Sequence, residues 1–85
     1  MKIKEKMTDM LSLPKEIILD LPLLIATGRQ ELNIENYKNL IEFTDTKIRI
    51  LTKAGVLTIE GQKLILKQVT SEHVLITGTI KGILW

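Results

Sequence analysis

The residues that could carry out chemistry are few and scattered in this sequence. His73 is the only histidine and there is no cysteine, which removes the paired His and Cys side chains of many metal and nucleophilic sites. Carboxylates recur along the chain, but no spacing holds two of them together for general acid and base catalysis. Ser12 and Ser71 lie in predicted turns with no base near them. We therefore expect a protein that is not an enzyme and has no metal site and no cofactor.

A basic stripe is the strongest sign of nucleic-acid binding in the sequence. Lys47 and Arg49 alternate on one face of a predicted strand, and Lys53 follows them. Such a stripe could contact phosphates, but a single strand also needs aromatic stacking platforms, and Phe, Tyr and Trp occur once each. A solvated sheet face, whose lysines discourage aggregation through strand edges, explains the same residues. We therefore predict no nucleic-acid partner and keep a small nucleic-acid-binding β-barrel as the alternative function.

The composition predicts one small domain with an aliphatic core. The chain has 85 residues, of which 30 are Ile, Leu or Val, and its net charge is only +2. This apolar fraction is too high for a disordered chain, and a domain of this size has little room for a large interior cavity. The elements that position any site must therefore be short and closely packed.

The first part of the chain differs in pattern from the rest. Met7, Met10 and Leu11 fall at helical spacing and predict a short amphipathic helix over residues 3–12, with one further helical turn over 14–19. A helix this short is unstable alone in water, so it must pack on the domain or on a partner. We divide the chain into a helical or extended N-terminal segment, residues 1–22, and a β-domain, residues 23–85.

No stretch of the sequence is long and apolar enough to cross a membrane. The longest apolar stretch, residues 17–26, is interrupted by Asp20 and Pro22. The start of the chain also lacks the uninterrupted apolar segment of a secretory signal, so we expect a cytoplasmic location without a membrane span. A third, weaker function class is a membrane-surface module that uses the N-terminal lysines and helix.

From residue 23 onward, apolar and polar residues alternate as they do in half-buried strands. The predicted strands are 23–27, 30–35, 39–44, 47–52, 56–60, 63–69, 73–77 and 79–84. These strands predict an all-β, single-domain sandwich or barrel of about eight short strands, preceded by the short N-terminal helix.

Residues that favour turns separate the predicted strands. The candidate turn or structural residues are Gly28, Asn36, Gly55, Gly61 and Gly78. Residues 32–38 also resemble residues 57–63 in type, and a repeat of this kind would suit a β-solenoid-like stack as the alternative fold. Two ordinary hairpin turns explain the similarity more simply, and this is the interpretation we favour.

Two segments in the second half are apolar on both faces, residues 64–66 and 74–76. A single sheet with one face in solvent cannot bury both faces of these segments, so a second layer is required. A second sheet, the N-terminal helix or a second copy of the chain would supply this layer. The chain also ends in apolar residues. The candidate interface residues are Met7, Met10, Leu11, Leu75, Ile83 and Trp85.

The order of turn residues and aliphatic positions resembles the YabP/YqfC family of sporulation proteins, and its YqfC branch in particular. The residues that carry the resemblance are Asp20-Leu21-Pro22, Gly28, Leu32-x-Ile34-Glu35-Asn36, Gly55-x-Leu57-x-Ile59-x-Gly61-x-x-Leu64 and Glu72-x-x-Leu75-Ile76-x-Gly78-x-Ile80-x-x-Ile83. The similarity covers nearly the whole chain, and none of these positions is a catalytic group.

The resemblance implies a non-catalytic protein with a structural or assembly role in the mother cell during endospore formation. It implies partners among other sporulation proteins, including a membrane-anchored one, and a place in the cytoplasm or peripherally at the forespore surface. Strands with unpaired edges can add to strands of another chain, so the residues themselves also favour protein contacts and a homo-oligomer.

Overall fold

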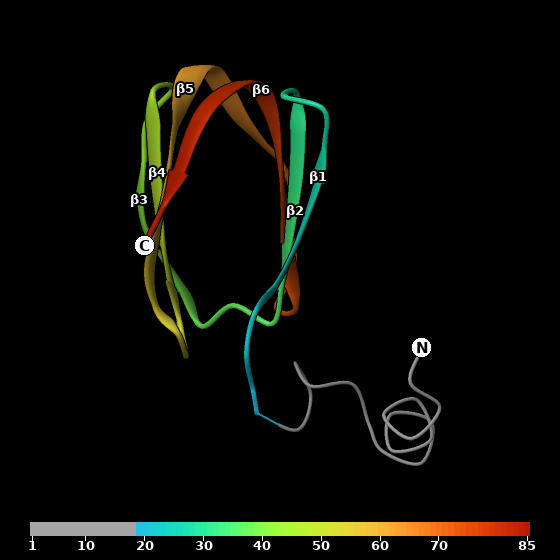
Figure 1. Ribbon diagram of the computed structural model, residues 1–85, viewed down its shortest axis with the longest axis vertical. Coiled ribbons are helices and arrows are strands. Elements are labelled where there is room, and N and C mark those ends of the chain that lie inside the picture. Colours follow the sequence, from blue (N-terminus) through green and yellow to red (C-terminus); the bar gives the residue numbers. More distant parts are fainter. Residues whose placement is uncertain (1–18) are drawn as a thin grey trace, which may run out of the picture.

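A computed structural model describes residues 19–85, which form one antiparallel sheet of six strands (Figure 1). The strands are β1 (Leu23–Thr27), β2 (Glu31–Glu35), β3 (Asn39–Phe43), β4 (Lys47–Thr52), β5 (Gly55–Val69) and β6 (His73–Leu84). Their order in the sheet is β1-β2-β6-β5-β4-β3. The all-β prediction is confirmed, whereas a closed barrel is wrong because β1 and β3 end the sheet without pairing to each other.

The structure contains no helix between residues 19 and 85. The helix predicted over residues 3–12 lies outside the described residues, as do Met7, Met10 and Leu11 and all but the last residue of the helical turn predicted over 14–19. Within the described residues, no helix has the length and hydropathy of a membrane span.

The short strands follow the alternating pattern of their residues. In β4, Ile48 and Ile50 are fully buried, while Arg49 between them is half-buried. In β2, Leu32 and Ile34 are fully buried in the same way. Successive side chains of a strand point to opposite faces, so a period of two places every second residue in the core.

The sequence predicted eight strands, and the structure has six because two pairs of predicted strands are continuous. The predicted strands 56–60 and 63–69 both lie in β5, and the predicted strands 73–77 and 79–84 both lie in β6. These two long strands bend sharply and pass from one side of the molecule to the other, so that the single sheet folds into two facing layers (Figure 1). Gly61 and Gly78, predicted in turns between strands, lie instead at this bend.

The bend requires glycine at both positions. A Cβ at Gly61 would lie under 3.0 Å from the Thr79 carbonyl oxygen, which a real Cβ essentially never does. A Cβ at Gly78 would lie 2.5 Å from the Lys63 carbonyl oxygen, and the φ of Gly78, 133°, is one that L-residues rarely adopt. Lys63 itself has a φ of 55°. The two strands therefore approach each other more closely here than side chains allow.

The turns of the two outer hairpins hold the bend in place. In the β3–β4 turn, the Thr46 carbonyl accepts from Gly61 N at 3.0 Å, and the Asp45 carbonyl accepts from Leu64 N at 2.8 Å. The β1–β2 turn does the same for β6. The Gln30 carbonyl accepts from Gly78 N at 3.2 Å, and the Arg29 carbonyl accepts from Ile80 N at 2.7 Å. Backbone groups freed by the bend are thus satisfied without a neighbouring strand.

One aliphatic core lies between the two layers. Its members are at most 8% exposed, and they are Leu32, Ile34, Ile48, Ile50, Leu57, Ile59, Leu64, Val74, Ile76 and Ile80. The second layer that the two-sided apolar segments require is therefore the other half of the same sheet. Ile65 is the exception, because it faces solvent and is 56% exposed.

The similarity between residues 32–38 and 57–63 does not reflect a repeated unit. Asn36 follows the end of β2, whereas Gly61, its counterpart, lies inside β5. A single folded antiparallel sheet replaces the alternative of a β-solenoid-like stack, which is wrong for the described residues.

Candidate functional site

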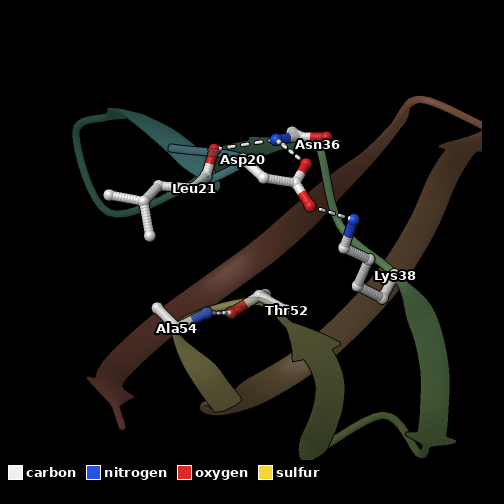
Figure 2. A network of polar contacts seen from close by, with 6 residues as sticks. All are labelled: Asp20, Leu21, Asn36, Lys38, Thr52 and Ala54. Atoms are coloured by element: carbon white, nitrogen blue, oxygen red, sulfur yellow. Dashed lines mark hydrogen bonds and ion pairs between the residues drawn. The ribbon is translucent and has the colours of Figure 1, made fainter. Parts of the chain in front are cut away.

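A polar network ties the chain before β1 to the connection between β2 and β3 (Figure 2). The Asn36 amide donates to Asp20 Oδ1 at 3.1 Å and to the Leu21 carbonyl at 3.0 Å. Lys38 Nζ lies 2.5 Å from Asp20 Oδ2 and forms an ion pair with it. Asn36 and Asp20 have φ angles of 62° and 61°. Asn and Asp tolerate this left-handed conformation better than most residues, which explains why these types occur where the chain turns.

The network stabilises the ionised form of Asp20. Hydrogen bonds from Lys38 and then from Asn36 lower the pKa of the Asp20 carboxyl below its ordinary value of 3.8, with smaller contributions from the charges of Lys38 and Lys53. Partial desolvation opposes them and raises the pKa. The Lys38 and Asp20 side chains are each 42% exposed, so solvent screens this ion pair.

We expect Asp20→Asn to lower the melting temperature at neutral pH by a modest amount. Because the folded-state pKa of Asp20 lies below the unfolded value, its ionised form stabilises the fold above about pH 4, and this contribution is lost as the pH falls through the folded-state pKa. The difference between wild type and variant should therefore shrink in thermal melts taken from pH 7 down to pH 2. Asp45→Asn is the control, because the Asp45 carboxylate makes no ion pair within residues 19–85. A difference that grows at low pH contradicts this assignment.

At the same end of the molecule, side chains join the β5–β6 turn to the connection that follows β2. The Tyr37 hydroxyl donates to the Thr70 carbonyl at 2.6 Å. His73, predicted to be a solvated loop residue, is half-buried at the start of β6, with Nδ1 at 3.2 Å from Thr70 Oγ1 and Nε2 at 2.9 Å from Gln68 Oε1. Its contacts are those of a residue that shapes a turn. Within residues 19–85, no three His, Cys, Asp or Glu residues lie close enough together to hold a metal ion.

A buried threonine organises the turn between β4 and β5. Thr52, which is 4% exposed, donates to the Gly55 carbonyl at 2.8 Å. It also accepts from the Ala54 N–H at 3.0 Å (Figure 2). These two bonds satisfy the hydroxyl in both of its roles. The sequence pattern indicated Gly55 at this turn, and nothing in it indicated the role of Thr52.

The predicted turn glycines and the basic stripe occupy separate places. Gly28 lies in the β1–β2 turn with a φ of 58°, and Gly55 lies at the start of β5 with a φ of 127°.

Of the stripe residues, Arg49 forms an ion pair with Glu42, with Nη1 at 3.5 Å from Oε1. Lys47 is opposite Glu60 in the register of β4 and β5. One charge of the stripe is therefore paired with an acidic side chain, and a second lies across the sheet from one.

The predicted interface residues do not form one patch. Leu75 is half-buried in the first half of β6, before the bend, and lies opposite Asn33 of β2. Ile83 and Trp85 lie after the bend, where they are 39% and 64% exposed. Leu84 lies between them and is 48% exposed. Three exposed apolar residues therefore follow one another from the end of β6 to Trp85, and Leu75 is separate from them.

The second half of β6 is an unpaired sheet edge. β2 pairs with β6 only as far as Thr77, so that Thr79–Leu84 pairs with β5 on one side and with no strand on the other within the described part of the chain. An open hollow of about 580 Å³ runs beside this edge. Its lining residues are Gly28, Arg29, Thr79, Ile80, Lys81, Gly82 and Ile83. Arg29 and Lys81 were not predicted, because nothing in the sequence places the β1–β2 turn against the second half of β6.

Comparison with known proteins supports one family. The model of the YabP family matches residues 22–85. The chain is similar to the uncharacterized protein YqfC of Bacillus subtilis strain 168, with 32% identity over 79 residues that cover 93% of this chain and 85% of that protein. No solved structure shows significant similarity to the chain. The matched region includes every strand of the sheet.

Proposed function

This chain belongs to the YabP/YqfC family, and we propose that it is a non-catalytic protein with a structural or assembly role in the mother cell during endospore formation. It acts through contacts with other sporulation proteins, including a membrane-anchored one at the forespore surface. Membership of the family supports the sporulation role, and the small number of chemically competent side chains in the sequence supports a role without catalysis.

The apolar end of β6 is the observation that carries the assembly role. Three consecutive large apolar residues, Ile83, Leu84 and Trp85, remain 39–64% exposed beside a strand edge without a neighbour. Exposed apolar clusters of this kind mark protein interaction sites, and tryptophan is enriched among the residues that dominate binding energy. Because Ile83 and Leu84 point to opposite faces of β6, a protein partner that contacts both faces of this end would remove all three side chains from water.

We expect Trp85→Ser to weaken capture of partner proteins from sporulating cells by roughly 30-fold, which corresponds to loss of one dominant aromatic contact. The measurement is recovery of the tagged full-length chain, identification of the proteins that accompany it, and the count of heat-resistant spores. Leu51→Ser is the control, because Leu51 is also a large apolar residue and is 39% exposed, but it lies on β4, which has β3 and β5 as neighbours on its two sides. Equal capture and equal spore counts for Trp85→Ser and wild type contradict the proposal.

Self-association is part of the same proposal. The two outermost strands, β1 and β3, each have one side without a strand neighbour in the described sheet. Such edges pair readily with another copy of a chain. Light scattering on the purified protein tests this, and a strict monomer at all concentrations would remove the homo-oligomer from the proposal.

A further inference from the structure

We propose that the unpaired edge of β6, Thr79–Leu84, binds an extended acidic segment of a partner protein as an added β-strand. This inference rests on the proposed role in protein contacts and gives that role a surface and a partner chemistry. The edge runs from the bend toward the C-terminal end of β6, with β5 on its other side (Figure 1).

The backbone of this edge is available for strand addition beyond Ile80. The β1–β2 turn closes its upper end, where the Arg29 carbonyl accepts from Ile80 N at 2.7 Å. Beyond Ile80, no other segment of residues 19–85 bonds to the outer side of β6. Unpaired N–H and C=O groups in a row are the template that an extended peptide completes when it adds to a sheet.

The hollow beside the edge has the charge that an acidic segment needs. Arg29 and Lys81 both line it, and none of its lining residues is acidic. Neither cation forms an ion pair or a side-chain hydrogen bond within the described part of the chain. Lys63 lies in the adjoining hollow around Thr79 and adds a third cation, and Glu31 lines that hollow as well. The Glu60 carboxylate lies beside Gly82 of the lining, and it forms no ion pair with Arg29 or Lys81. A segment with carboxylates would meet these two positive groups.

The same charges argue against a second copy of this chain as the occupant. Two β6 edges that paired with each other would bring two copies of Lys81 and two of Arg29 to one interface, with no acidic residue from either lining. Like charges across an interface are unfavourable, and an acidic partner has no such cost.

The apolar residues of the edge indicate that the acidic partner segment also contains apolar residues. Ile83 lies opposite the fully buried Ile59, so that Ile83 faces the core side, and Leu84 lies opposite Thr58 on the outer side. The residues of an added strand that face the core side would lie beside Ile83 and would be apolar, and every second residue would face the other way, which leaves those positions for Asp or Glu. The partner segment is therefore one in which apolar residues alternate with Asp or Glu.

The test uses a short labelled peptide of alternating Glu and Val, with a peptide of alternating Lys and Val as the comparison. We expect the acidic peptide to bind the full-length chain in fluorescence anisotropy and to bind less tightly as salt is raised. In ¹H–¹⁵N spectra, shifts should be confined to the Thr79–Leu84 edge and the Gly28–Arg29 turn. Lys81→Glu should weaken binding about tenfold or more, whereas Lys67→Glu, on the exposed part of β5, should leave it unchanged.

Three outcomes overturn the inference. They are equal binding of both peptides, shifts located on β1 or β3, and a dimer that the Lys81→Glu change dissociates. Spectra of Lys81→Glu in the absence of peptide establish that the variant is folded. If the inference fails in this way while Trp85→Ser still abolishes capture from cells, then the role in protein contacts stands and only the assignment of this edge falls.

Discussion

Gly78→Ala should destabilise the protein by about 2–6 kcal/mol, from the backbone strain of a non-glycine residue at this φ together with the clash that its Cβ creates. The φ of Gly78 is 133°, and the added Cβ would lie 2.5 Å from the Lys63 carbonyl oxygen and 2.9 Å from Leu64 Cα. Both obstacles are backbone atoms, which cannot move aside as a flexible side chain can. A domain of this size has about 5–15 kcal/mol of stability, so the change removes a large part of it.

Urea unfolding followed by circular dichroism measures this loss, and Gly82→Ala is the matched control. Gly82 lies in the same strand, its φ is not in the left-handed region, and the nearest atom to an added Cβ is the flexible Glu60 Oε1 at 3.8 Å. We expect the control to retain nearly the stability of wild type. Equal stability for the two variants would show that β6 does not bend at Gly78. Gly61→Ala tests the opposite strand at the same bend, because the Thr79 carbonyl blocks its Cβ.

Ile59→Ala should cost about 2–5 kcal/mol, because it removes buried methyl and methylene groups and leaves a cavity in a close-packed core. Ile59 is fully buried in β5, between Ile48 of β4 and Ile83 of β6 in the sheet register. The same substitution at Ile65 changes the same atoms in the same strand on the other side of the bend, where the side chain is 56% exposed. We expect Ile65→Ala to change the free energy of unfolding by less than about 0.5 kcal/mol.

The contrast between these two isoleucines tests how the sheet is folded. The sequence pattern placed Ile59 in an alternating strand and Ile65 in a stretch that is apolar on both faces, and only the structure shows that Ile59 is buried while Ile65 is exposed. Comparable losses from the two substitutions, measured by urea unfolding with unchanged slope, would mean that a further layer covers Ile65.

The candidate surfaces were predicted only in part, and the reason is the same for each. Asn36 stood out because its residue type favours a turn, but its partner Asp20, which also pairs with Lys38, comes from an earlier segment that only the fold brings beside it. Ile83 and Trp85 stood out because they are apolar at the end of the chain, whereas Arg29 and Lys81 lie in unremarkable polar positions. Local residue type predicts local conformation, and a site assembled from distant segments leaves no local pattern.

The sequence alone determined that this is an all-β protein with an aliphatic core and no recognisable catalytic constellation, because strand periodicity and residue type are local properties. It also placed the short strands correctly, with Leu32, Ile34, Ile48 and Ile50 on the buried face. Only the tertiary structure decided whether a glycine ends a strand or bends it. That distinction depends on which backbone lies opposite, and at Gly61 and Gly78 the opposite backbone is another part of the same two long strands.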